Sequence, residues 1–149
     1  MDLRYIIATI HVLTFGLGFY SVWARASALR NLKDENGIKA VLAADNLWGV
    51  AAALWLATGL WRAFGGLEKG SDYYLQNTAF LIKMSLFALV FALEIKPMVT
   101  FIRWRISLGR KQPIDLSVAP SLARISYIEL ILLIPIVAMA TAMARGILY

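Results

Sequence analysis

Five ionisable side chains interrupt the long apolar stretches of this 149-residue sequence, and their types could support chemistry: His11, Asp45, Lys83, Glu94 and Glu129. An ionisable group at the centre of a membrane helix costs about 2.5–3.5 kcal/mol on insertion scales, so each one indicates a functional site or a buried pair. His11 is the sole histidine of the chain. Because imidazole can ligate a metal and transfer protons near neutral pH, His11 is the first candidate for a catalytic or metal-binding residue.

His11 and Lys83 are predicted to lie at the same depth in the membrane. Each lies about seven or eight residues in from the same end of its apolar run, which at helical rise is roughly 10–12 Å below one surface. We therefore expect His11 to face the bundle interior opposite Lys83. A neutral imidazole bonded to a neighbouring helix and a lysine that extends to the outer surface remain open as alternatives.

The three acidic residues lie near the opposite ends of their helices, close to basic residues. Arg25, Lys96 and Arg124 can supply the opposite charge there. The sequence predicts a second polar cluster on the inner side, more structural than catalytic, made of Arg25, Asp45, Glu94, Arg124 and Glu129.

Four apolar runs have the length needed to position these residues across a bilayer. Hydrophobic residues make up 60% of the chain, charged residues 16%, and the mean hydropathy is +0.69. The runs cover about 3–26, 41–63, 76–101 and 122–147, and about 20 helical residues cross a hydrocarbon layer roughly 30 Å thick. We predict an all-α integral membrane protein, a single four-transmembrane-helix domain over residues 1–149.

The basic residues predict the orientation. Most of them lie in the first and third connections, whereas Arg4, Arg62, Lys69 and Arg145 lie near the other helix ends. The positive-inside rule then places both termini on the non-cytoplasmic side of a bacterial inner membrane, as a multi-pass protein whose first run is retained.

Composition excludes several functional classes. The chain has no cysteine, so it has no disulfide framework and no thiolate metal site. Its net charge of +6 comes from residues that flank apolar runs, which argues against nucleic acid and for the lipid bilayer as partner. The lone histidine lies in an apolar run, so no hydrolase triad is indicated.

Spacing in the third run suggests one polar face. Gln76, Lys83 and Glu94 are separated by seven and eleven residues, and both intervals return a helix to nearly the same side. Such a stripe would be unfavourable against lipid, so we expect it to face the bundle interior.

Several segments resemble known families. The matches are Ile10-His11, Leu47-Trp48-Gly49 with Thr58-Gly59-Leu60-Trp61, Ile82-Lys83-Met84, and Arg124 with Tyr127 and Glu129. On these, the chain distantly resembles the HemJ-type protoporphyrinogen oxidases. Residues 19–25, 73–84 and 101–105 more closely resemble a family of uncharacterised bacterial four-helix membrane proteins related to that group.

The HemJ resemblance implies a b-type haem and an essential pair formed by a histidine in the first helix and a lysine in the third. The corresponding expectation is a haem- or porphyrin-binding membrane oxidoreductase, protoporphyrinogen oxidase-like, with His11 and Lys83 as catalytic residues.

The residues themselves also allow haem, because a flat apolar porphyrin suits the core of a helical bundle. His11 can be one axial ligand. The second ligand is open between Lys83 as a neutral amine, Met139 and Met143, and Lys83 can instead hold a propionate as an ammonium group. A homodimer or higher homo-oligomer, and a porphyrin or quinone-like small molecule, are the expected partners.

Two other functional classes stay open. One is a small dimeric transporter in which the acidic residues titrate. The other is a non-catalytic scaffold or accessory subunit, in which the amphipathic segment 97–110 and its basic loop bind a partner or anionic lipid.

Overall fold

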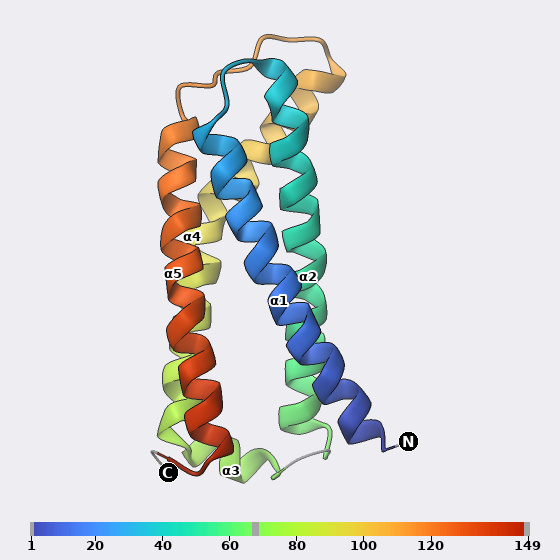
Figure 1. Ribbon diagram of the computed structural model, residues 1–149, viewed down its shortest axis with the longest axis vertical. Coiled ribbons are helices and arrows are strands. Elements are labelled where there is room, and N and C mark those ends of the chain that lie inside the picture. Colours follow the sequence, from blue (N-terminus) through green and yellow to red (C-terminus); the bar gives the residue numbers. More distant parts are fainter. Residues whose placement is uncertain (1, 67–68, 148–149) are drawn as a thin grey trace.

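The part of the chain that the structure describes folds into four long helices and two short ones. A computed structural model describes residues 2–66 and 69–147 (Figure 1). The helices are α1 (Leu3–Arg30), the 3-10 helix η1 (Glu35–Gly37), α2 (Ile38–Phe64), α3 (Ser71–Gln76), α4 (Thr78–Gly109) and α5 (Ala119–Ala144).

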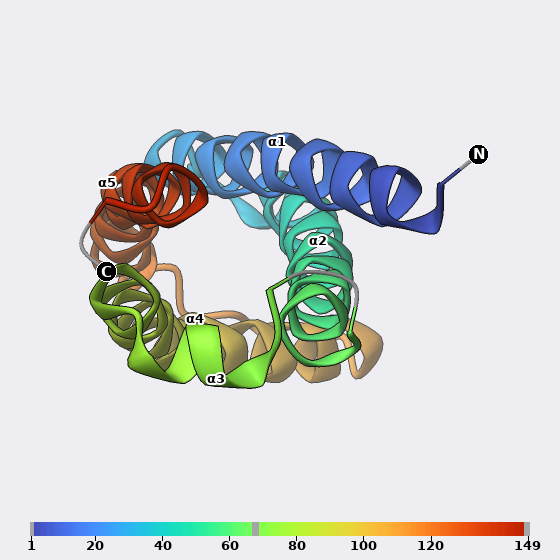
Figure 2. The same cartoon turned by 90° about the horizontal axis from the view of Figure 1, so that it is seen from below.

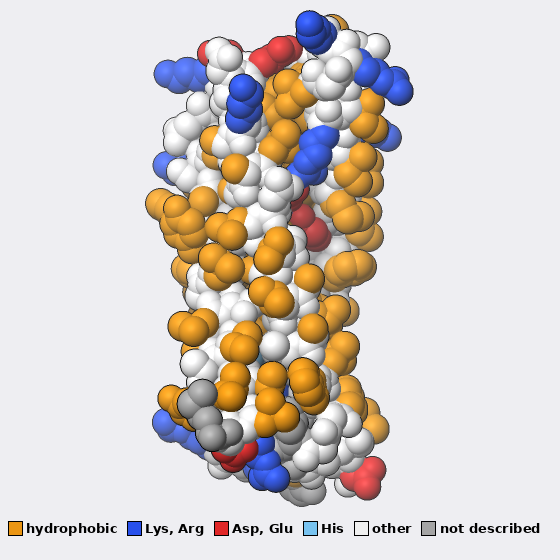
Figure 3. Space-filling view, turned by 90° about the vertical axis from the view of Figure 1, so that its right-hand side faces the viewer, with side chains coloured by type: hydrophobic (Ala, Val, Ile, Leu, Met, Phe, Trp, Pro, Cys, Tyr) orange, Lys and Arg blue, Asp and Glu red, His pale blue; other side chains and the backbone are white. Residues whose placement is uncertain are grey.

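The four long helices are long and apolar enough to cross a membrane, which confirms the predicted fold class. Large hydrophobic side chains lie exposed along their outer faces, as on α1 at Leu13 and on α5 at Ile131. Figure 3 shows that hydrophobic side chains cover much of the middle of the molecule, while charged side chains gather mostly towards its two ends. This surface suits lipid around the middle and water at both ends.

The four long helices are arranged in a ring (Figure 2), and a hydrogen bond joins α4 to α2 towards the loop end. α1 packs against α2 and α5, and α4 packs against α5. Seen from below, α4 starts beside α5 and slants across towards α2 (Figure 2). The α1–α2 and α4–α5 connections lie at one end and both termini lie at the other, as predicted, and α3 lies at the end of the termini. The side of the membrane that each end faces stays a prediction.

The start of α4 differs from the predicted third span. Asn77 has an extended backbone (φ −86°, ψ 116°), and its side chain accepts a hydrogen bond from the Phe80 N–H at 3.0 Å. This cap begins a new helix, since an N-cap residue has non-helical backbone angles. The predicted polar stripe through Gln76 is therefore wrong, because Gln76 is an exposed residue that ends α3.

The other end of α4 also differs. The helix continues without a break through the buried Pro97 to Gly109, so the segment predicted to be a surface amphipathic helix is the last part of a 32-residue helix. α5 begins at Ala119 with Pro120 in its first turn, as expected for a residue that lacks a backbone N–H.

Apolar side chains form three clusters stacked along the bundle. One at the loop end contains Leu29, Phe101, Trp104 and Leu122, a middle one contains Val22, Trp48, Val90, Leu133 and Ile136, and one beside α3 contains Ala63, Tyr74 and Phe80. The middle cluster draws residues from all four long helices, so it holds the bundle together at half height.

The packing of Gly18 on α1 against Trp48 on α2 predicts a stability effect. A Cβ added to Gly18 would lie 3.1 Å from the Trp48 ring, whereas one added to Gly16 would meet nothing within 4 Å. Gly18→Leu should lower stability by about 1–3 kcal/mol through overpacking. The midpoint of thermal unfolding in detergent should fall for Gly18→Leu and stay near the wild-type value for Gly16→Leu. Equal effects of the two substitutions would contradict the packing described here.

Candidate functional site

A cavity of about 400 Å³ lies in the half of the bundle that holds the termini. Its walls come from all four long helices, and α3 contributes Tyr73 and Tyr74. Both His11 and Lys83 line it. The structure therefore brings the two residues singled out by depth into one cavity.

A hydrogen bond from α2 fixes the imidazole of His11. Its Nδ1 lies 2.8 Å from the hydroxyl oxygen of Thr58, a buried residue. The Thr58 hydroxyl lies 2.7 Å from the Leu54 carbonyl oxygen one turn earlier, and only the hydroxyl can supply the proton between these two oxygens. Since Thr58 has a single hydroxyl hydrogen, it accepts from His11. The neutral imidazole thus carries its proton on Nδ1, which leaves Nε2 with a free lone pair.

Aromatic rings and a glycine surround His11. The Trp55 ring centroid lies 5.8 Å from that of His11, and Trp55 also packs against Phe15 at 5.5 Å and Phe87 at 5.8 Å. A Cβ on Gly59 would lie 3.2 Å from Cε1 of His11, so the absence of a side chain there lets α2 approach the imidazole. The imidazole is held between a hydroxyl and an aromatic wall.

Positively charged residues share this cavity. Lys83, Arg62 and Lys69 line it, and no carboxylate does among the residues that the structure describes. The ammonium of Lys83 lies 5.0 Å from the Phe80 ring centroid, a cation–π distance. A mostly apolar cavity that contains the Lys83 ammonium suits a molecule that is largely apolar and carries negative charge.

The two methionines predicted as possible ligands differ in whether they line the cavity. Met143 lines the cavity, and its carbonyl accepts a hydrogen bond from the Tyr73 hydroxyl at 3.1 Å. Met139, one helical turn away, does not line it, so it stands outside the site predicted from the sequence. Met84 lines the cavity and was missed, because a methionine beside Lys83 in an apolar helix is usually a packing residue.

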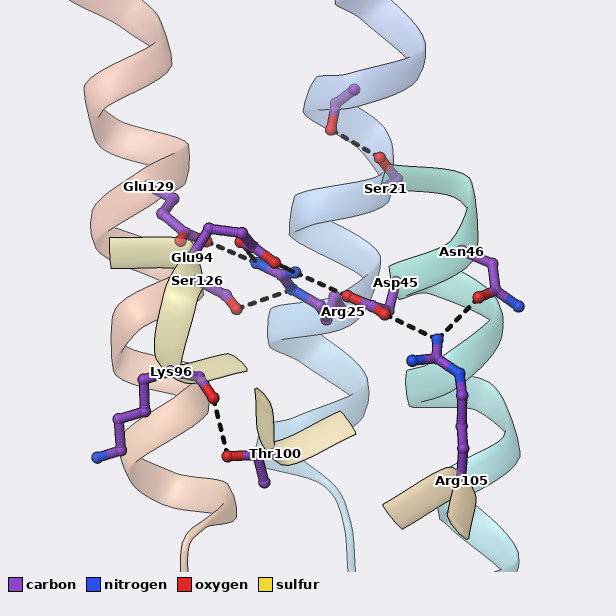
Figure 4. A network of polar contacts seen from close by, with 11 residues as sticks. Ser21, Arg25, Asp45, Asn46, Glu94, Lys96, Thr100, Arg105, Ser126 and Glu129 are labelled. Carbon is purple, nitrogen blue, oxygen red and sulfur yellow. Dashed lines mark hydrogen bonds and ion pairs between the residues drawn. The ribbon is translucent and has the colours of Figure 1, made fainter. Parts of the chain in front are cut away.

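A second polar site lies nearer the loop end and is centred on Arg25, whose side chain is fully buried (Figure 4). Its five N–H groups are all used. Nε donates to Ser126 at 3.1 Å, Nη1 to Asp45 at 3.1 Å and Glu94 at 2.7 Å, and Nη2 to Glu94 at 2.8 Å and Glu129 at 2.6 Å. One guanidinium therefore joins all four long helices; we call this group of residues the Arg25 network.

Arg105 extends the network and was missed from the sequence. Its Nη2 donates to Asp45 at 2.8 Å and to the amide oxygen of Asn46 at 2.7 Å. Two predicted partners lie elsewhere: Arg124 is exposed and does not join the network, and Lys96 donates to Ser121 at 2.8 Å. Both carry charge at helix positions that point away from Arg25.

The middle apolar cluster separates the two polar sites. A small gap within it, lined by Gly18, Phe19, Trp48 and Leu133 among others, is too small to hold a water molecule. Among the described residues, no polar chain links the cavity to the Arg25 network through this layer. The two sites therefore act in separate environments.

The Arg25 network predicts a large stability effect. Arg25→Gln should leave three carboxyl groups without their shared cation, and breaking a buried ion pair costs about 3–5 kcal/mol. Thermal unfolding in detergent should show a strongly lowered midpoint for this variant. Arg30→Gln is the matched control, because Arg30 lies exposed on the same helix. A near-wild-type midpoint for Arg25→Gln would show that the network contributes little to stability.

Comparison with known proteins gives the family. A comparison with curated proteins found no match, and one with solved structures found none either. A family model described as "Predicted membrane protein (DUF2214)" matches residues 3–148, nearly the whole chain. The chain therefore belongs to this family of predicted membrane proteins.

Proposed function

We propose that the protein binds haem or a related porphyrin in the His11 cavity and has a redox role, in the manner of a protoporphyrinogen oxidase. The observation that carries the proposal is the His11–Thr58 hydrogen bond of 2.8 Å beside an apolar cavity. Metal-ligating histidines typically donate their second ring N–H to a fixed acceptor, which sets the tautomer and the ring orientation. Thr58 does this for His11.

The cavity has suitable chemistry for such a ligand. Its volume of about 400 Å³ falls within the range of small-molecule sites, roughly 300–1,000 Å³. Its lining is largely aliphatic and aromatic, and aromatic faces such as Trp55 suit a flat ring system. Lys83 would pair with a carboxylate of such a molecule.

The possible metal-ligating side chains of the cavity suit a cofactor such as haem, whose porphyrin already supplies most of the ligands of the metal. Among the described residues, no group of three His, Cys, Asp or Glu side chains could hold a bare metal ion. Haem iron needs only one or two protein ligands, and bound haem would supply one-electron redox chemistry at the iron. Nε2 of His11 would hold the iron, and Met143 and Met84 line the same cavity.

Several finer features belong to the same proposal. The protein would be a multi-pass protein of a bacterial inner membrane, with the cavity and both termini on the non-cytoplasmic side. This orientation is supported by the basic residues of the two connections at the other end. A homodimer or higher homo-oligomer stays a prediction from the sequence.

The absorption spectrum of the purified full-length protein tests the proposal. After haem supplementation we expect a Soret band and a reduced-minus-oxidised difference signal, both lost in His11→Ala. Lys83→Met should weaken haem binding about tenfold or more, because a charge-assisted contact contributes about 1.5–3 kcal/mol. Lys96→Met, on the same helix but bonded to Ser121, is the control. A supplemented wild type without a Soret band, or a His11→Ala spectrum like that of the wild type, would refute haem ligation by His11.

Thr58 provides a sharper test of the imidazole's orientation. Thr58→Val keeps the side-chain shape but leaves Nδ1–H without its acceptor, and loss of such a partner typically weakens metal-ligand binding about 10–100-fold. Haem titration should show this loss, with folding unchanged. Thr141→Val is the control, because Thr141 also lines the cavity and bonds to a carbonyl one turn earlier, yet does not contact His11. Equal affinities for the two variants would remove the role of Thr58.

A further inference from the structure

The Arg25 network carries an inference that does not rest on the proposed function. We propose that it is a proton-binding site, in which Glu129 holds a proton that it shares with Glu94. The ligand is the proton itself, and the site lies at the opposite end of the bundle from the His11 cavity.

The two carboxyl oxygens of Glu129 differ in their hydrogen bonds. The side chain of Glu129 is fully buried, and only its Oε2 is bonded to Arg25; Oε1 has no hydrogen-bond partner among the described residues. Arg25 cannot supply one, since its five N–H groups are already used. A bare carboxylate oxygen in such a place is costly, whereas a proton on Oε1 turns it into a donor.

Glu94 is the neighbour that can share this proton. Its Oε2 and the Oε2 of Glu129 both accept from Nη2 of Arg25, at 2.8 and 2.6 Å, so the two carboxyl groups lie beside each other (Figure 4). Two carboxyl groups that share a site do not both ionise readily, because like charges repel at short range. One proton bound between them removes this repulsion.

The charges that face the site lead to the same conclusion. α1 contributes Arg25, α2 contributes Asp45, α4 contributes Glu94 and Arg105, and α5 contributes Glu129. Three carboxyl groups thus meet two guanidinium groups, which leaves one excess negative charge when all are ionised. An uncompensated charge is strongly unfavourable in a membrane interior. Binding of one proton makes the group neutral overall.

The proton reaches the site from the loop end. Asp45 and Glu94 are 14% and 17% exposed, whereas Glu129 is fully buried. Figure 3 shows acidic side-chain atoms in a recess between helices, within the half of the molecule that holds the loops. The middle apolar cluster closes the opposite direction. Glu94 therefore passes the proton between water and Glu129: its O–H bond breaks as the one on Glu129 forms.

Infrared spectroscopy of the full-length protein in lipid bilayers tests this proposal. A protonated carboxyl group has a C=O stretching band that a carboxylate lacks, and the band shifts in heavy water. We expect this band in the wild type at pH 7. It should disappear in Glu129→Gln and also in Glu94→Gln, since removal of one carboxyl group removes the excess charge. It should persist in Glu35→Gln, because Glu35 is an exposed residue outside the network.

Circular dichroism selects the variants that fold, and glutamine can still accept from Arg25. A wild type without the band, or a band that persists in any folded variant of Glu129 or Glu94, would overturn the proposal.

Discussion

The buried guanidinium of Arg25 is the interaction on which the arrangement of the four helices depends. Its three carboxyl partners come from three different helices, and Arg25 itself belongs to the fourth. Such a group is costly to bury, so its hydrogen bonds must all form at once. This requirement draws α2, α4 and α5 towards α1 at one level. Arg105 then brings the far end of α4 to α2, which produces the slant of α4 seen in Figure 2.

The slant of α4 has a consequence at the opposite end of the bundle. Where α4 begins it lies beside α5 and away from α2, and the space between is lined by aromatic and aliphatic residues and by three cations. Aromatic contacts such as that of Phe64 with Phe80, at 6.4 Å between ring centroids, connect α2 and α4 beside this cavity. The close approach of the helices at the Arg25 network and the cavity at the other end are therefore both consistent with the slant of α4. The Arg25 network gives each of the three acidic residues a cation as partner.

Much of the fold could be predicted because hydropathy and loop charge act on whole segments. The four spans, the common end of the termini and the shared cavity of His11 and Lys83 follow from run lengths and helical rise. The hydrogen-bond partners of each polar residue depend on the directions of the side chains, which the sequence does not show. Arg105 belongs to a stretch with surface composition, yet it reaches Asp45 because α4 continues through Pro97. In the sequence, Thr58 stands out only as part of a matched segment, because no pattern shows that its hydroxyl meets the His11 ring.

The tautomer of His11 limits which ligand chemistry the cavity can accept. With Nδ1–H committed to Thr58, neutral His11 offers only the lone pair of Nε2. An oxidised quinone presents carbonyl oxygens, which are acceptors, so it gains no hydrogen bond from this nitrogen. A metal centre, a hydroxyl group or a pyrrole N–H does complement it. The same imidazole can thus ligate iron or take a proton from a reduced tetrapyrrole, and both fit the porphyrin hypothesis better than they fit an oxidised quinone.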